Sequence, residues 1–307
     1  MKIIAIVVTY NGIKWYERCF GSLRSSNIPV QTVVIDNSPS DETTEYIKKN
    51  YPEIHLVKSA ENLGFGKANN IGLRYAIEQK ADFVLLLNQD AWIKPDTIEK
   101  LATAMDTDSR FGILSPVHLT GTEGKLDHGF SKYFNRDYPT VPGPDLMPQK
   151  DEAGHIYPVS FVNAAIWLMS RDCLNDIGGF DPLFPHYGED YNYITRLRFH
   201  KYKIGILSSA YAIHDRDSEL KKELSFKQRK NKIYVAYLMR LLDINTTLLY
   251  NLGRLALSAG CAAIKNILCL SFSGFIIELF VSFSLISSLP TVIKHRKVSK
   301  RRGLNFL

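Results

Sequence analysis

Three short polar groups could carry chemistry, and each follows an apolar run typical of a buried strand. Thr9-Tyr10-Asn11 follows residues 3–8, Asp36-Asn37-Ser38 follows 32–35, and Asn88-Gln89-Asp90 follows 83–87. In an open α/β sheet, ligands bind outside the carboxyl ends of the strands. The spacing therefore predicts one polar site shared by three strands.

Asp90 has the chemistry of a ligand for a hard divalent cation. Mg²⁺ takes one or two protein carboxylates and fills its remaining positions with waters and substrate phosphates. A carboxylate just after a buried strand, with Asn88 two residues earlier, suits that ion. The alternative is a helix N-cap, because Lys94-Pro95-Asp96 opens a helix soon afterwards.

Asp36 and Tyr10 could both recognise a nucleoside. The Asp36 carboxylate could accept hydrogen bonds from a ribose or from a ring N–H of a pyrimidine base, and the Tyr10 ring could pack on a base. An Asx-turn with Asn37 and Ser38 would explain Asp36 equally well. Ordinary packing would explain Tyr10.

A glycine-bearing segment, Asn62-Leu63-Gly64-Phe65-Gly66-Lys67, leads into a helix predicted over 67–79. Exposed amide N–H groups at the start of that helix could accept a phosphate. The segment is not a dinucleotide fingerprint, because no third glycine falls in place, and it is not a P-loop, because no Gly-Lys-Ser/Thr is present. These two differences argue against a dehydrogenase or an NTPase.

Glu189-Asp190 lies at the predicted start of a helix over 189–201. A carboxylate there that faces a substrate hydroxyl could act as a general base. Acidic residues also favour helix N-termini for electrostatic reasons alone, so the pair could merely stabilise the helix. His214, next to Asp215, could contact a metal or a phosphate, although a lone histidine is more often structural.

The elements that must position these residues alternate in the manner of an α/β fold. Strands are predicted over 3–8, 32–35, 54–57 and 83–87, with helices over 15–25, 40–50 and 67–79 between them. Such spacing predicts parallel pairing with right-handed crossovers. Residues 120–158, rich in Gly, Pro and Asp, are predicted to form a loop over the site, and residues 160–170 return to a strand-like pattern.

The net charge of +7 is divided unevenly along the chain. Residues 221–307 hold 15 Lys and Arg against 3 Asp and Glu, a charge of +12, whereas residues 1–220 carry −5. A basic tail attracts polyanions, either nucleic acid or an anionic membrane surface. We expect a catalytic domain over 1–232 and a helical, apolar and basic segment over 233–307.

The apolar run 267–289 decides between these partners in favour of a membrane. It is long enough to span a bilayer, but its central Glu278 would cost ~2.5–3.5 kcal/mol on insertion. Helices lying in the interface, followed by basic residues, are therefore favoured. Nucleic acid is not expected, since phosphate binding gains nothing from the neighbouring Phe and Leu. The alternative is an apolar hairpin packed on the domain or on a partner in a homo-oligomer.

The cysteines and the N-terminus indicate the compartment. The four cysteines show neither CxxC nor zinc-finger spacing, which suits a reducing compartment. Met1 leads directly into a strand-like run that is too short for a signal peptide. We therefore expect the chain at the cytoplasmic face of the plasma membrane, as a peripheral or monotopic protein.

In order and spacing, these groups resemble the inverting glycosyltransferases of family 2, with the GT-A fold, and most closely the bacterial rhamnosyltransferase-like branch. The resemblance covers about residues 1–240. Its motifs are Thr9-Tyr10-Asn11, Asp36-Asn37-Ser38, residues 62–70, Leu87-Asn88-Gln89-Asp90, Gly178-Gly179-Phe180-Asp181 and Gly188-Glu189-Asp190.

The resemblance implies a doubly wound, mixed but mainly parallel sheet and a role for each motif. Asp190 would be the catalytic base, and Asp90, the last residue of a DxD motif, would bind Mg²⁺ or Mn²⁺ with His214 as a further contact. Glu189 and Trp167 are assigned to the acceptor side of the pocket. The donor would be bound by Thr9, Tyr10, Asn11, Asp36, Asn62, Gly64, Lys67, Asn69 and Asn88.

Two residues depart from the family pattern. Asn88 stands where many members have Asp, which leaves one carboxylate at the metal, and Asn192 stands where relatives often carry a further acid. The first departure implies weaker metal binding, and the second puts an acceptor contact at that position in doubt.

The function implied is transfer of a sugar, such as rhamnose, from a dTDP- or UDP-linked donor to a hydroxyl of a lipid-linked or cell-surface polysaccharide acceptor. Two alternatives remain open. A nucleotidyltransferase that makes nucleotide-sugars also uses a doubly wound sheet, but it needs a glycine-rich basic loop after the first strand. A sugar-binding module without activity would fit Asn88 and Asn192.

Overall fold

The computed structural model describes residues 1–121, 124–139, 154–184, 186–215 and 224–307. The loop predicted over 120–158 lies partly outside these residues. Its described part holds a helix, α5 (His128–Asp137), and a short strand, β7 (Ile156–Pro158), so the prediction of a plain loop was wrong there. The Asp127 carboxylate caps α5 by accepting from the Phe130 N–H, a start signal embedded in an otherwise turn-rich segment.

Nine strands form one mixed sheet within the described residues, in the order β3-β2-β1-β4-β8-β6-β9-β5, with β7 also paired to β9. The neighbours β3, β2, β1 and β4 run parallel, whereas β8 is antiparallel to both β4 and β6. The other strands are β1 (Ile3–Thr9), β2 (Val30–Asp36), β3 (His55–Lys58), β4 (Phe83–Asn88), β5 (Ala91–Ile93), β6 (Phe111–Leu119), β8 (Ile166–Ser170) and β9 (Lys203–His214). The predicted mixed, mainly parallel sheet is confirmed.

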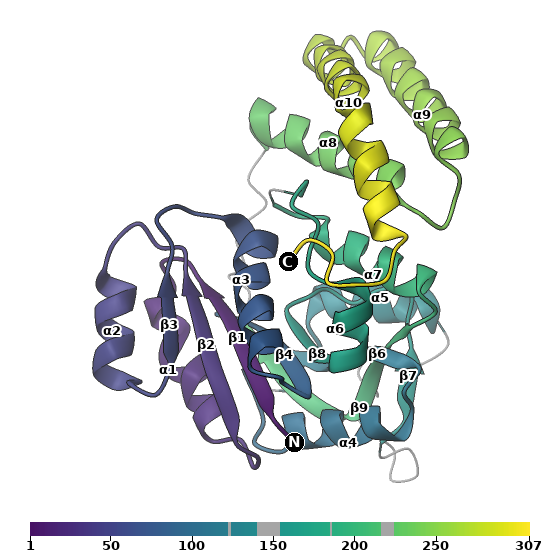
Figure 1. The fold of residues 1–307 in the computed structure, drawn as a ribbon. Coiled ribbons are helices and arrows are strands. Elements are labelled where there is room, and N and C mark those ends of the chain that lie inside the picture. Colours follow the sequence, from purple (N-terminus) through teal and green to yellow (C-terminus); the bar gives the residue numbers. More distant parts are fainter. Residues whose placement is uncertain (122–123, 140–153, 185, 216–223) are drawn as a thin grey trace.

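Helices cover both faces of the sheet (Figure 1). On one face α3, α5, α6 and α7 enclose one apolar core, and on the other α1, α2 and α4 enclose a second. The helices are α1 (Ile13–Arg24), α2 (Glu42–Asn50), α3 (Gly64–Glu78), α4 (Thr97–Thr107), α6 (Arg171–Ile177) and α7 (Glu189–Phe199). The central strands are buried on both faces, which is why they appear in the sequence as continuous apolar runs.

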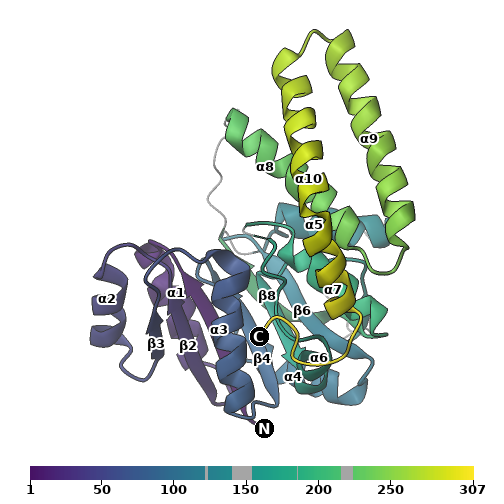
Figure 2. The ribbon, with the colours of Figure 1, turned by 45° about the horizontal axis from the view of Figure 1, so that its top comes forward.

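Three C-terminal helices form a separate layer above the catalytic sheet: α8 (Phe226–Leu242), α9 (Leu248–Leu268) and α10 (Phe272–Ser299). The predicted boundary after residue 232 falls inside α8, so this layer begins earlier than expected. Figure 2 shows α9 and α10 rising side by side from α8, joined at the end far from the sheet. We call this pair the α9–α10 hairpin.

The packing of the hairpin against α8 explains how the acidic Glu278 is accommodated within the apolar run. Ile277, Val281 and Leu285 form a buried stripe on α10 in the core shared with α8. Glu278 is buried beside them, and its carboxylate accepts the Tyr237 hydroxyl of α8 at 2.9 Å. A hydrogen-bonded partner removes much of the penalty of burying a polar group.

The C-terminal residues return to the catalytic domain and hold the hairpin to it. The Asn305 carbonyl accepts the Gly179 N–H at 2.8 Å, and the Asn70 amide of α3 donates to the Phe306 carbonyl at 3.1 Å. A Cβ at Gly178, where φ is +77°, would overlap the Asn305 backbone. Glycine is therefore required at this position both by the backbone angle and by the close approach of the tail.

Arg296 of α10 ties the hairpin to the loop between α8 and α9. Its buried guanidinium donates to the carbonyl oxygens of Leu241, Asp243 and Thr246, each at 2.6 Å. We expect Arg296→Ala to lower the free energy of unfolding by about 2–4 kcal/mol, because it leaves buried carbonyls without donors. Denaturant unfolding measures this, and Lys297→Ala, an exposed neighbour, is the control. Equal effects of the two substitutions would contradict the assignment.

Candidate active site

The three polar groups lie at adjacent strand ends, because β2, β1 and β4 are neighbours in the sheet. The parallel register pairs Thr9 with Asp36 and Val8 with Asn88. Parallel strands bring their carboxyl ends to one edge, so the side chains that follow the three strands converge there.

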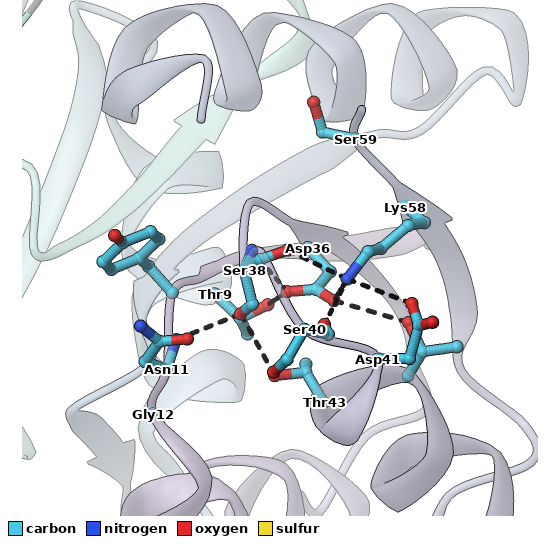
Figure 3. Close-up of polar contacts among 12 residues, drawn as sticks. Thr9, Asn11, Gly12, Asp36, Ser38, Ser40, Asp41, Thr43, Lys58 and Ser59 are labelled. Carbon is cyan, nitrogen blue, oxygen red and sulfur yellow. Dashed lines mark hydrogen bonds and ion pairs between the residues drawn. The ribbon is translucent and has the colours of Figure 1, made fainter. Parts of the chain in front are cut away.

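Asp36 forms the centre of a buried polar network at this edge (Figure 3). Its Oδ1 accepts the Thr9 hydroxyl at 3.1 Å and the Ser38 N–H at 2.9 Å. Its Oδ2 accepts the Thr44 hydroxyl at 3.4 Å and the Lys58 ammonium at 3.1 Å. The carboxylate is fully buried, so its contact with a base stays a prediction, and a ligand would have to replace one of these donors.

Lys58 is a site residue that sequence reasoning missed. It ends β3, and besides Asp36 its ammonium donates to the carbonyl oxygens of Ser38 and Ser40 at 2.9 and 2.5 Å (Figure 3). Lys58 therefore fixes the loop after β2 as well as neutralising Asp36. The available signal was its place at the end of the strand predicted over 54–57, next to the strand that ends at Asp36.

The loop after β1 is fastened to the residues after β4. Gln89 lies between Asn88 and Asp90. Its side-chain oxygen accepts the Tyr10 N–H at 2.8 Å, and its side-chain amide donates to the Tyr10 carbonyl at 3.1 Å. Asn11, with φ of +49°, donates its N–H to the Ser38 hydroxyl. The Tyr10 ring is exposed. Thr9 is buried and its hydroxyl donates to Asp36, so Thr9 supports the position of Asp36 and is not accessible to a ligand.

The segment before α3 is held to the same edge by Asn37. Its side-chain oxygen accepts the Leu63 N–H at 3.4 Å and its amide donates to the Gly64 carbonyl at 3.5 Å. Asn62 and Lys67 are exposed, and Gly64 opens α3 with φ of +74°. Asn69 differs from the prediction: its side chain is buried and donates to the Phe65 carbonyl, so it has no access to a donor.

Asp90 and His214 are neighbours, as a shared cation would require. The turn after β4 returns as β5, which pairs with β9 so that Ala91 is opposite His214. The His214 Nε2 lies 3.5 Å from the Asp90 Oδ1, and about a fifth of the Asp90 side chain is exposed. Within the residues that the structure describes, no group of three or more His, Cys, Asp or Glu could hold a metal.

One carboxylate and one imidazole still fit a Mg²⁺ or Mn²⁺ whose other ligands come from a substrate diphosphate and water, because Mg²⁺ binds few protein groups. The two residues therefore fit such an ion only in the presence of a phosphorylated ligand. Asn88 provides no second carboxylate, which agrees with the weaker binding expected from the sequence.

Asp190 reaches the same edge through β8. The Asp190 carboxylate accepts the N–H groups of Tyr191, at 2.7 Å, and of Ala164. The next residue, Ala165, accepts the Asn88 N–H at 2.8 Å. Asp190 and Asp90, one hundred positions apart, are thus linked through two adjacent backbone segments. Burial raises the pKa of Asp190, and the two N–H donors act in the opposite direction.

Glu189 lies in a tight, apolar position between α7 and α3. Its side chain is buried, and a Cβ at Gly66 would lie 3.6 Å from the Glu189 Cβ. Burial, with the Asp190 charge as a second cause, raises the pKa of Glu189 to about 7. Its Oε2 and the Oδ1 of Asn163 are buried without a hydrogen-bond partner in the described structure. Such atoms are typical of a site that receives a polar ligand.

Trp167 does not belong to the pocket. It lies in β8 with no exposed surface, and its ring packs against Phe180 and Tyr193 in the core beneath the site. The assignment to the acceptor side was therefore wrong, because the ring is enclosed in the apolar core between the sheet and the helices α3, α6 and α7. A single strand-like run does not show which of its residues face outward.

The buried Glu189 predicts a stability that falls as the pH rises. Its pKa in the folded chain lies above its ordinary value, so the folded state binds more protons and loses stability between about pH 4.5 and pH 7. Glu189→Gln should therefore stabilise the chain by about 1–3 kcal/mol at pH 8 and have little effect near pH 4.5. Urea unfolding at both pH values measures this. Glu78→Gln, on the exposed face of α3, is the control, and an equal gain at both pH values would contradict the assignment.

Comparison with known proteins agrees with this geometry. The model of glycosyl transferase family 2 matches residues 4–178. A low-salt glycan biosynthesis hexosyltransferase, Agl10, of Haloferax volcanii is 26% identical over 60% of this chain, which spans 58% of the length of that relative. An N-acetylglucosaminyl-diphospho-decaprenol L-rhamnosyltransferase of Mycobacterium tuberculosis is 25% identical over 62% of this chain and 69% of its own.

A solved structure supports the fold. The mannosyltransferase PcManGT from Pyrobaculum calidifontis, in complex with GDP-Man and Mn²⁺, has a TM-score of 0.56 and 17% identity, covering 97% of this chain and 86% of its own. The family match spans more than half of the chain and includes the strand ends that carry Asp36 and Asp90. This chain therefore belongs to glycosyltransferase family 2, with the GT-A fold and rhamnosyltransferase-like relatives.

Proposed function

We propose that this chain transfers a sugar from a nucleoside diphosphate to a hydroxyl of a lipid-linked acceptor, in one displacement that inverts the anomeric carbon. The observation that carries the proposal is the convergence of Asp90 and Asp190 through Asn88 and Ala165. In this proposal the diphosphate lies at the Asp90 end of the strand edge, and the acceptor hydroxyl lies at the Asp190 carboxylate, whose pKa is raised by burial.

The donor would lie along the ends of β1, β2 and β4. Tyr10 offers an exposed ring to a base, and Lys67 and the open start of α3 offer positive charge to phosphates. When bound, Mg²⁺ or Mn²⁺ held by Asp90 and His214 would neutralise charge on the leaving diphosphate. Rhamnose is favoured by the mycobacterial relative, which is named as an L-rhamnosyltransferase, and a dTDP donor by a Shigella flexneri relative named as a dTDP-rhamnosyl transferase.

The acceptor would be deprotonated by Asp190. Its raised pKa makes the carboxylate a stronger base than an exposed aspartate. Glu189, protonated over part of the physiological range, could donate a hydrogen bond to an acceptor oxygen in the same pocket. Asp190 would take the proton from the acceptor hydroxyl while the oxygen attacks from the face opposite the leaving group.

Replacing the base separates catalysis from donor binding. Asp190→Asn should lower turnover by roughly 10²–10⁴-fold, because general-base catalysis is lost, and should leave the thermal stabilisation by a nucleoside diphosphate with Mn²⁺ unchanged. Release of nucleoside diphosphate from a panel of nucleotide-sugars measures turnover. Asp172→Asn, an exposed carboxylate of α6, is the control. Near-normal turnover of Asp190→Asn would show that the base is another group, and release of pyrophosphate would indicate a nucleotidyltransferase.

The α9–α10 hairpin would place this chemistry at a membrane. Among the described residues, α10 is the helix long and apolar enough to cross a bilayer, with a mean hydropathy of 1.9. Large apolar side chains cluster in exposed positions where α9 meets α10: Leu268, Leu270 and Phe272 are each more than three-quarters exposed. The basic residues Lys294, Lys297 and Lys300 lie at the opposite end of α10. This pattern suits a hairpin that enters the bilayer with its turn foremost, leaving the cations at the head groups.

The turn of the hairpin is therefore expected to dominate membrane binding. Leu270→Ser should weaken co-sedimentation with anionic vesicles by roughly 30-fold, because burying such a side chain in hydrocarbon is worth about 2 kcal/mol. Leu249→Ser, equally exposed but at the other end of α9, is the matched control. A larger effect of the control, or none of Leu270→Ser, would contradict insertion by the turn.

A further inference from the structure

A pocket lies between α7 and the C-terminal helices. It has a volume of about 180 Å³ and is lined by Tyr191, Met239, Arg240, Asp243, Thr246, Asn251 and Arg254. Tyr191 directly follows the proposed base, so this pocket, which we call the arginine pocket, adjoins the acceptor side of the site. Its residues come from α7, α8, the following loop and α9.

The arginine pocket carries a net positive charge. Arg240 and Arg254 are exposed, and in the part of the chain that the structure describes neither lies within salt-bridge distance of a carboxylate. Arg240 donates to the Ser258 hydroxyl at 2.8 Å. The Asp243 carboxylate accepts the N–H and side-chain amide of Asn245, at 2.9 and 3.0 Å, which occupies one of its oxygens. Paired guanidinium groups are suited to phosphate oxygens, which they bind bidentately.

A separate apolar slot of about 240 Å³ lies along the hairpin. It is lined by Leu241, Leu252, Leu255, Ala256, Ala259, Ser282, Leu285, Ile286 and Leu289. On α9 the polar stripe of Asn251, Arg254 and Ser258 borders the apolar stripe of Leu252, Leu255 and Ala259, because residues three and four apart share a helix face. Consecutive residues of α8 and α9 thus line the two cavities, as with Arg240 and Leu241, and the apolar cavity lies between α9 and α10. Figure 2 shows this helix pair rising from the domain.

We infer that the arginine pocket binds the phosphate or diphosphate of a lipid-linked acceptor and that the slot holds the first part of its hydrocarbon chain. This inference rests on the proposed function. It follows from charge and placement: the cationic pocket is lined by Tyr191, the residue after the proposed base, and shares the helices α8 and α9 with the apolar slot. A ligand with a sugar, a phosphate group and a hydrocarbon chain, in that order, matches the three surfaces.

The inference explains why the C-terminal layer is built onto α7. With the phosphate on Arg240 and Arg254, a sugar attached to it would extend past Tyr191 toward Asp190. The exposed Tyr191 ring offers that sugar an apolar surface, and the Phe161 ring lies 6.0 Å away, so two aromatic faces border the path. The hairpin would then position the acceptor as well as contact the membrane.

The test uses the full chain and phosphatidylcholine vesicles that contain a polyprenyl diphosphate. Comparison vesicles contain phosphatidylglycerol at the same surface charge. The wild-type chain should co-sediment at least roughly tenfold more tightly with the first kind, and Arg240→Ala with Arg254→Ala should remove this preference, since charge-assisted hydrogen bonds are lost. Arg74→Ala, an exposed arginine of α3, is the control for loss of charge.

A substitution in the slot tests the lipid chain separately. Ala256→Phe should fill part of the slot and weaken binding of the polyprenyl diphosphate vesicles several-fold, without changing binding of inorganic pyrophosphate. Equal binding of the two vesicle types by the wild-type chain would overturn the inference in favour of a general anionic surface. An unchanged preference in the double arginine variant would overturn it as well.

Failure of the proposed function gives a different result. Thermal stabilisation by UDP, dTDP or GDP with Mn²⁺ reports donor binding, which the arginine pocket does not touch. If the wild-type chain shows no stabilisation by any of them, the transferase proposal fails. If the double arginine variant keeps the stabilisation and loses only the lipid preference, both the proposed function and the inference are supported.

Discussion

The site depends on one antiparallel pairing, that of β8 with β4. Without it, the strands that end at Asp36 and Asn88 would form only one half of the candidate site, and α7 would have no fixed position relative to them. The hydrogen bond from the Asn88 N–H to the Ala165 carbonyl joins the two halves, and the Ala164 N–H then holds the Asp190 carboxylate. These two hydrogen bonds thus fix the position of Asp190, which would deprotonate an alcohol, relative to the strand that leads to Asp90, which would bind a diphosphate through a cation.

The C-terminal layer is an integral part of this arrangement. The tail threads back between α3 and α6, where Asn70 joins Phe180 to Phe306. Arg196, fully buried in α7, donates to the carbonyl oxygens of Ile177 and Gly179 and packs under the Phe306 ring. The helix that carries Asp190 is therefore fixed by contacts from both the sheet and the tail.

Much of the fold could be predicted from the sequence, because local signals and tertiary structure agree there. The first four strands and the helices between them were placed within a few residues, since continuous apolar runs and turn clusters mark them. The helix at His128 was missed because Gly, Pro and Asp are frequent over residues 120–158 as a whole, and the Asp127 cap is the local signal that marks its start. The C-terminal boundary was placed too late because α8 is basic at its start and apolar at its end, so composition changes within one helix.

Site residues could be predicted by type and position but not by exposure. Asp90 and His214 lie 3.5 Å apart, as the family resemblance implies, and their binding of a cation stays a prediction. Trp167 and Asn69 were expected in the pocket, and both are buried, since a short motif does not show which side chains face inward. Lys58 was missed because its role depends on the neighbouring strand. The arginine pocket could not be predicted either, because it is assembled from α7, α8 and α9, whose packing against one another has no local signal.

The most direct test of the central claim is a crystal structure of the chain with Mn²⁺ and a nucleoside diphosphate. The account predicts an anomalous Mn²⁺ peak bound by Asp90, with the diphosphate on the ion and the Asp190 carboxylate facing it across an open cleft. A peak bound elsewhere, or an Asp190 side chain separated from the diphosphate by the protein, would contradict the account.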